Sequence, residues 1–172
     1  MVKQKRSLAT GFVKKKNRDK IILASKIVSK SDGLEWIRAG SKNLGFDKKN
    51  MNEAIDASLK RLKTDYIDLY QLHWPERKVP KFGTLDYKYD PSDTDWTPIE
   101  QVLENLQQLI KSGKIRYIGI SNETPYGLSK YLEISKNYGA KTIKRPSEIS
   151  NDQSTSEEAL LHFASNVDFD II

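Results

Sequence analysis

The sequence contains no cysteine, only two methionines and two histidines, and no long uncharged run of apolar residues. The lack of cysteine excludes disulfides, thiolate metal sites and a cysteine nucleophile. Because a membrane helix needs a run of about 20 apolar residues, we expect no membrane partner. The basic residues near the amino terminus lack the apolar core of a secretory signal, so we expect a cytoplasmic protein.

Charge and size set further bounds. The 172 residues are 37% hydrophobic and 30% charged, which is enough for one domain with a core and short for two. The formal charge of +6 includes a run of three lysines at 14–16, which leaves polyanion binding as one open alternative. The basic residues are not interleaved with aromatic ones, and no DNA-binding motif is present. We therefore expect no nucleic-acid partner.

Strand-like and helix-like segments alternate along the chain. The apolar run 20–28 predicts a strand buried on both faces, and further strands are predicted at 66–72 and 114–120. Apolar residues at helical spacing predict a helix after Asn50, which we expect to be its N-cap. They predict another after Thr97, which we expect to form a capping box with Glu100. Two more helices are predicted at 125–138, stopped by Gly139, and at 157–164, capped by Ser154 or Thr155. Residues 148–149 and 169–172 indicate weaker strands.

This order of elements predicts parallel βαβ units, with the helices on one side of the sheet. It fits an open doubly wound sheet or part of a β/α barrel, and we count four or five strands. A complete eight-stranded barrel typically needs about 250 residues, so the 172 residues are too few for one.

Polar side chains follow three of the predicted strands, at Lys26, at His73 and at Ser121 with Asn122. In β/α architectures the carboxyl ends of the strands meet at one edge, where reactive groups gather. Each group alone has a structural alternative: a solvated lysine, a hydrogen-bonded histidine at a turn, or a serine and asparagine that cap a helix. Their coincidence at one edge favours a site. The second histidine, His162, is predicted to be structural.

Three stretches of this sequence carry a resemblance to a known family. KTDYIDLYQLHWP, GKIRYIGISNETPYGL and RDKIILASKI resemble signature regions of the aldo-keto reductases, which are NAD(P)H-dependent carbonyl reductases on a β/α barrel. NMNEAIDASLKRL also matches, and the loop HWPERKVPKFGTLDYKY is similar to that of one bacterial-type subgroup. The resemblance covers about 17–145, and 146–172 diverge. It implies a single domain over 1–172 with an α/β fold, a partial TIM-type barrel.

The resemblance also implies roles for the residues at the strand ends. Lys26 matches the catalytic lysine and His73 the histidine that orients the substrate carbonyl, while Trp74 would line the substrate pocket. Ser121 and Asn122 match the pair that binds the nicotinamide carboxamide. The implied cofactor is NADPH, although the residues do not choose it over NADH, and the implied substrate is a small aldehyde or ketone. No metal site is implied.

Two parts of the family pattern are missing. The family's catalytic tyrosine and aspartate lie on a strand upstream of the lysine strand, but only about 20 residues precede that strand here. Where family members have a glutamine and an asparagine that support the nicotinamide, this sequence has Ser150 and Asn151, and it ends before the family's cofactor-phosphate loop. We therefore expect impaired NADPH binding and weak or absent activity.

Two further expectations follow from an incomplete barrel. The open sheet edges and the apolar inner face predict a homo-oligomer that covers them, or a poorly stable chain, with 21–28 as an edge. The alternative function is a non-catalytic interaction or regulatory module that uses the loops 31–47 and 74–95 as binding surfaces.

Overall fold

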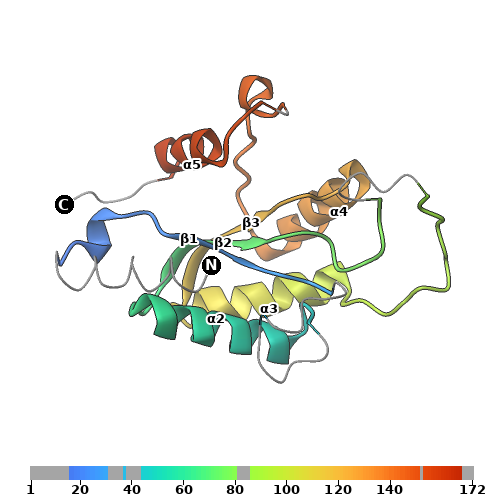
Figure 1. Cartoon of the computed structure of the whole chain (residues 1–172), viewed down its shortest axis with the longest axis horizontal. Coiled ribbons are helices and arrows are strands. Elements are labelled where there is room, and N and C mark those ends of the chain that lie inside the picture. Colours follow the sequence, from blue (N-terminus) through green and yellow to red (C-terminus); the bar gives the residue numbers. More distant parts are fainter. Residues whose placement is uncertain (1–15, 31–36, 38–43, 81–85, 152, 168–172) are drawn as a thin grey trace.

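Three parallel strands form the sheet, in the order β1, β2, β3 (Figure 1). They are β1 (Ala24–Ile27), β2 (Ile67–Leu72) and β3 (Ile115–Ile120). The computed structural model describes residues 16–30, 37, 44–80, 86–151 and 153–167. Within these residues the parallel βαβ prediction is confirmed, with three strands in place of the four or five expected. The predicted strand at 169–172, most of the lysine run and most of the loop 31–47 lie outside the described residues.

Helices cover the two faces of this sheet differently (Figure 1). The elements are η1 (Arg18–Lys20), α2 (Lys48–Leu62), α3 (Ile99–Lys111), α4 (Pro125–Ser135), η3 (Lys136–Tyr138), η4 (Ser147–Ile149) and α5 (Ser156–Ser165). α2 and α3 lie against one face, and α4 packs beside α3. α5 lies over the opposite face, where the ring of Phe163 meets that of Tyr117 edge-on, at 5.3 Å between centroids. The prediction that all helices lie on one side is therefore wrong for α5.

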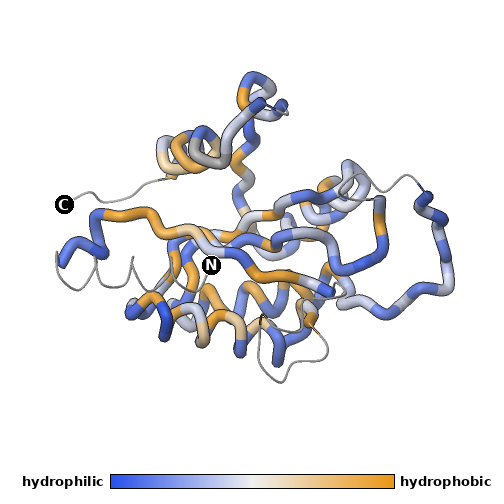
Figure 2. Tube along the Cα trace, in the orientation of Figure 1, coloured by the Kyte–Doolittle hydropathy of each residue, from blue (hydrophilic) through white to orange (hydrophobic). Residues whose placement is uncertain are grey.

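The hydrophobic core lies between the sheet and the helices α2, α3 and α4. Figure 2 shows hydrophobic and hydrophilic residues within the turns of α2 and α3, as expected of helices with one apolar face. Ile55, Ile67 and Tyr70 are fully buried in this core. None of the described α5 residues is buried to that degree. The face under α5 is therefore much less densely packed.

Two predicted helix starts are wrong. α2 begins at Lys48 with Asp47 as its N-cap, whose side chain accepts from the Asn50 N–H at 3.0 Å; Asn50 itself lies inside the first turn. α3 begins at Ile99 without a side-chain cap, and the Thr97 N–H, which the predicted capping box paired with Glu100, donates to the Glu76 carboxylate at 3.2 Å. At both helix starts, a carboxylate therefore accepts from the N–H of the residue that was predicted to be the cap.

Other boundaries divide into confirmed and corrected ones. Thr124 caps α4, and Thr155, one of the two caps predicted there, caps α5. Gly113 and Gly139 follow the ends of α3 and η3 with φ of +74° and +69°, and Gly139 is the predicted stop. Residues 148–149 form a 3-10 turn, because η4 occupies them, so the predicted strand there is wrong.

The predicted first strand is also too long and too buried. β1 alternates, with Ser25 and Ile27 buried and Ala24 and Lys26 half-buried. The Asp68 and Leu69 N–H groups both donate to the Leu23 carbonyl, at 3.0 and 3.1 Å, which interrupts the regular ladder before Ala24. Within the described sheet β1 and β3 are the two edges, so the prediction that this segment is an edge is confirmed.

The amino ends of the strands are held by a buried carboxylate. Asp68, 1% exposed, accepts from Arg18 at 2.7 Å, from Arg116 at 3.0 Å and from the Leu23 N–H at 2.9 Å. The same two guanidinium groups lie over the ring of Tyr66, at 3.9 and 4.0 Å from its centroid. This cluster joins η1, β2, β3 and the residue before β1, so it fixes the amino end of the sheet.

Candidate active site

The strand ends that the sequence singled out lie together at the carboxyl edge of the sheet. The His73 N–H donates to the Ile27 carbonyl at 2.9 Å, and the Ser121 N–H donates to the Leu72 carbonyl at 2.9 Å. Lys26 pairs in register with Gln71, two residues before His73. Parallel register therefore places Lys26, His73 and Ser121 together at the carboxyl ends of the strands.

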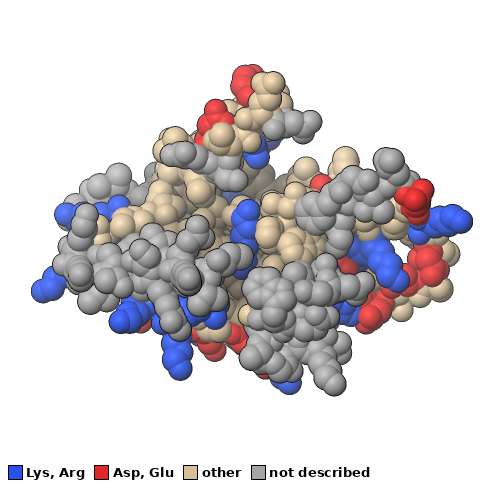
Figure 3. Space-filling view, viewed as in Figure 1, with Lys and Arg blue, Asp and Glu red and all other residues tan. Residues whose placement is uncertain are grey.

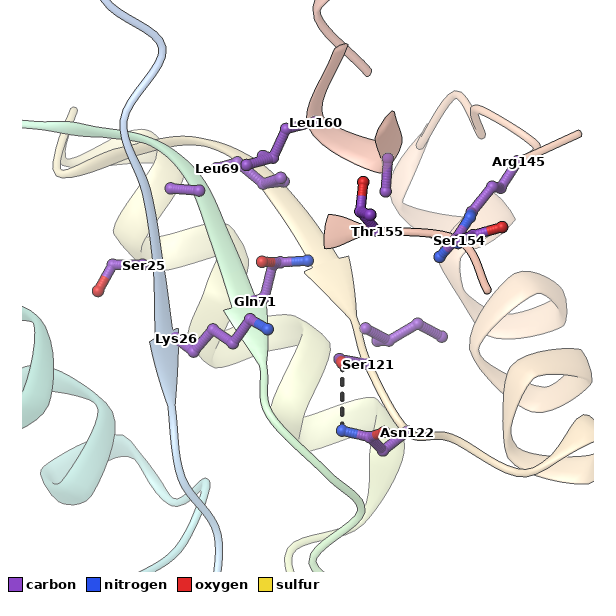
Figure 4. A pocket seen from close by; sticks show the side chains of 13 residues that line it. Ser25, Lys26, Leu69, Gln71, Ser121, Asn122, Arg145, Ser154, Thr155 and Leu160 are labelled. Carbon is purple, nitrogen blue, oxygen red and sulfur yellow. Dashed lines mark hydrogen bonds between the residues drawn. The ribbon is translucent and has the colours of Figure 1, made fainter. Parts of the chain in front are cut away.

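Asn122 ties two of these strand ends together. Its Nδ2 donates to the His73 carbonyl at 2.8 Å and to the Ser121 Oγ at 3.3 Å, the second bond being drawn in Figure 4. Its backbone has φ of +55°, a left-handed conformation that asparagine tolerates better than most residues. The two donated bonds leave the Asn122 Oδ1 and the Ser121 hydroxyl hydrogen for a ligand.

His73 is held in a neutral form. Burial lowers the pKa of His73 below its usual 6.5, and the nearby Lys26 ammonium lowers it further. Its Nδ1 is buried and has no hydrogen-bond partner within the described part of the chain. A neutral imidazole can donate one hydrogen bond and accept another, which suits it to orienting a polar ligand atom.

Trp74 lies beside His73 and not in the open. It is 9% exposed and packs with Val28 and Leu44. The centroid of its ring lies 4.4 Å from that of His73, with the ring planes tilted by 37°. Ser29, which is fully buried, donates to the Pro75 carbonyl at 3.0 Å and fixes the turn that follows. Trp74 therefore supports the imidazole from one side, and its predicted contact with substrate stays a prediction.

A cavity of about 520 Å³ opens between this edge of the sheet and the segment that leads into α5 (Figure 4). It is lined by residues of all three strands and of the segment 145–160: Ala24, Ser25, Lys26, Leu69, Gln71, Ile120, Ser121, Asn122, Arg145, Ser154, Thr155, Ala159 and Leu160. Three predicted site residues, Lys26, Ser121 and Asn122, thus share one cavity. His73 and Trp74 are not among its lining residues.

Several lining residues were not predicted from the sequence. Gln71 lies inside a strand, and Arg145 and Ser154 lie in a segment without a clear periodic pattern. Only the fold brings that segment back over the sheet. Arg145 stands nine residues before Ser154, the nearest predicted cap that follows it, so the sequence does not reveal which element its side chain faces.

The described residues include no metal cluster and no membrane-spanning helix, and the second histidine lies outside the cavity. Among the residues that the structure describes, no group of three or more His, Asp or Glu side chains is arranged to hold a metal ion. His162, the other histidine, accepts from Asn166 through its backbone carbonyl at 2.8 Å and takes no part in the cavity. No described helix has the length and apolar character that would let it cross a membrane.

Comparison with known proteins shows similarity to aldo/keto reductases along most of the chain. The sequence model of the aldo/keto reductase family matches residues 4–164. An aldo-keto reductase from Babesia bovis is 43% identical over 126 residues, which cover 70% of this chain and 44% of that protein. Protein tas from Escherichia coli (strain K12) is 40% identical over 141 residues, covering 78% of this chain and 39% of that protein.

A solved structure agrees with the sequence comparisons. The holo form of an aldo-keto reductase from Bacillus halodurans is similar with a TM-score of 0.51 and 33% identity, covering 75% of this chain and 35% of that one. The fold is that of part of a β/α barrel, as predicted. The chain belongs to the aldo/keto reductase family, and it spans about two fifths of the length of the relatives it matches.

Proposed function

We propose that this chain carries the lysine, the histidine and the nicotinamide-binding pair of a cytoplasmic carbonyl reductase, with a nicotinamide cofactor and a small aldehyde or ketone as ligands. The observation that carries the proposal is the meeting of Lys26, His73 and Asn122 at one edge, where Asn122 binds the His73 carbonyl at 2.8 Å. Membership of a reductase family supports the same reaction class.

The cavity fits one part of such a cofactor. The Ser121 hydroxyl and the Asn122 Oδ1 offer one donor and one acceptor, the set that a carboxamide needs. A reduced nicotinamide supplies hydride to a carbonyl carbon. NADPH is the form that the family resemblance favours.

The protein groups would act on the carbonyl oxygen, which gains negative charge as the carbon is reduced. The neutral His73 can donate a hydrogen bond to that oxygen, and the Lys26 ammonium stabilises charge near it. The Trp74 ring, packed beside the imidazole, limits its rotation and would form one wall for the substrate.

The proton donor of the family is the missing element in this proposal. Among the described residues that line the cavity there is no tyrosine. Removing a general acid commonly slows a reaction by about 10²–10⁴-fold. We therefore propose weak turnover, with cofactor binding weaker than in a complete barrel.

The test is titration of the 172-residue chain with NADPH, followed by NADPH oxidation in the presence of an aromatic aldehyde. We expect saturable cofactor binding that Asn122→Ala weakens, and slow oxidation that Lys26→Met and His73→Gln reduce further. Lys144→Gln is the control, because it removes a charge from an exposed lysine outside the cavity. Absence of NADPH binding would refute the proposed function. Ordinary turnover would refute the proposal that the chain lacks a proton donor.

Self-association is a second property that the surface favours. α4 exposes Leu128 and Leu132, at 44% and 39%. Together with the outer edges of β1 and β3, which have no partner strand in the described sheet, these two leucines support a homo-oligomer. Analytical ultracentrifugation should show a species larger than the 19.7 kDa monomer, and a compact, stable monomer would contradict it.

A further inference from the structure

We infer that the cavity between the sheet and α5 binds the anionic group of a small molecule, a carboxylate or a phosphate, between Lys26 and Arg145. The inference concerns binding alone and goes beyond the proposed reaction, since it requires neither cofactor nor turnover.

Among the described residues, the charges that line the cavity are all of one sign. Lys26 comes from β1 and Arg145 from the segment between η3 and η4, and no described aspartate or glutamate belongs to the lining. In Figure 4 the Lys26 side chain extends from one wall toward the space, and Arg145 extends toward it from the opposite wall. Figure 3, which has the orientation of Figure 1, shows atoms of Lys or Arg in a crevice near the centre of the molecule. Like charges that face one space favour an anion there.

No described residue gives Lys26 an anionic partner. No hydrogen bond or ion pair of its ammonium is found within the described part of the chain, although the side chain is half-buried. Other lysines near the sheet are paired, as Lys114 is with Asp56 at 2.6 Å. A partly desolvated ammonium without a counter-charge gains more from an incoming anion than a solvated one does.

Arg145 is oriented by its own loop. Its Nε donates to the Ile149 carbonyl, within η4, and among the described residues no partner occupies the two terminal nitrogens of the guanidinium, which can therefore bind a ligand. A guanidinium with two free nitrogens matches the paired oxygens of a carboxylate or a phosphate. Arg145 can therefore bind such a group with two hydrogen bonds.

The remaining polar groups of the cavity can complete the site. The Gln71 amide lies between the two cations, and the Ser121 hydroxyl keeps its hydrogen for donation. Glu158, the carboxylate beside this wall, is already engaged, since it accepts from the Thr155 N–H at 2.7 Å in the capping box. It therefore does not take the place of the ligand between the two cations.

The size and the apolar walls define the ligand further. Ligand cavities commonly measure about 300–1,000 Å³, and this one measures about 520 Å³. Leu69 and Leu160 also line it, so a short apolar body fits beside the charged group. A small organic acid or a small phosphate ester has this combination.

The test is isothermal titration of the full 172-residue chain with inorganic phosphate and, separately, with acetate, at constant ionic strength and without cofactor. We expect saturable binding of at least one probe, and the tighter one identifies a phosphate or a carboxylate ligand. Lys26→Met and Arg145→Gln should each weaken it about tenfold, because each removes a charge-assisted contact. Arg145→Lys should lie between Arg145→Gln and the wild type.

Lys144→Gln is the matched control, since it removes one positive charge next to Arg145 but outside the cavity. It should change the affinity by less than about twofold. No saturable binding of either probe, or equal weakening by Lys144→Gln and Arg145→Gln, would overturn the site. Circular dichroism of each variant separates loss of the site from loss of the fold. Because no cofactor is present, failure of the proposed reduction leaves this result unaffected, and the reverse also holds.

Discussion

The described charged groups at the two ends of the sheet differ in whether they have partners. At the amino end Asp68 is buried and has three partners: Arg18, Arg116 and the Leu23 N–H. At the carboxyl end the Lys26 ammonium and the buried Nδ1 of His73 have no partner within the described residues. The buried charge at the amino end is therefore paired, whereas Lys26 and His73 at the carboxyl end have no partner among the described residues.

This difference separates stability from binding. In β/α folds the amino ends of strands serve the structure, and the carboxyl ends carry function. Unsatisfied polar groups destabilise a protein unless a ligand completes them. We therefore expect substitutions at the amino end to change the free energy of unfolding and those at the carboxyl end to change ligand binding.

The largest expected effect is at Asp68. Asp68→Asn leaves two arginines without a counter-charge and puts an amide N–H against their donors, so it should lower the free energy of unfolding by about 3 kcal/mol. Urea unfolding measures this loss. Asp65→Asn is the control, because Asp65 is exposed in the same stretch and should cost under about 0.5 kcal/mol. A loss below 1 kcal/mol for Asp68→Asn would show that the cluster does not hold this end.

The two arginines should not contribute equally. The side chain of Arg18 is 15% exposed and that of Arg116 is 48% exposed. Arg18→Gln should therefore lower the free energy of unfolding by about 1–2 kcal/mol, and Arg116→Gln by less than about 1 kcal/mol, because water screens the more exposed pair. Urea unfolding of both variants checks the order, and a reversed order would contradict the role of burial.

A smaller effect is expected at the start of α5. Thr155→Ala removes the side chain that accepts from the Glu158 N–H at 3.1 Å and so breaks the capping box. We expect α5 to lose about 1 kcal/mol of local stability. Hydrogen exchange should then be faster in α5 and unchanged in α3, which is part of the dense core. Equal acceleration in both helices would show that α5 unfolds only with the whole domain.

The smallest effect concerns the protonation of His73. Its pKa should lie below 6.5, and Lys26→Met should raise it only partly, because burial is the larger cause. Since the unfolded chain then binds the proton more readily, this group favours the folded state above pH 6.5, and that contribution is lost as the pH falls toward the folded-state pKa. NMR titration of the imidazole measures both values, and a wild-type pKa of 6.5 or more would be a contradiction.

The sequence predicted the strand-end residues better than it predicted the walls around them. β2 and β3 were placed within a residue, because their aromatic and β-branched residues leave no competing pattern. The apolar run before Ala24 predicts a strand, but the two hydrogen bonds that the Leu23 carbonyl accepts, from the N–H groups of Asp68 and Leu69, interrupt the ladder there. Arg145 could not be placed, because its position depends on how 145–160 fold back over the sheet.

The central claim is that the carboxyl edge of the sheet is a ligand site and the amino edge is not. It is tested most directly by amide NMR spectra of the 172-residue chain during titration with NADPH. We predict saturable shifts at His73, Ser121 and Asn122, with none at Tyr66 or Asp68. Shifts of equal size at both edges, or no saturable shift at the carboxyl edge, would contradict it.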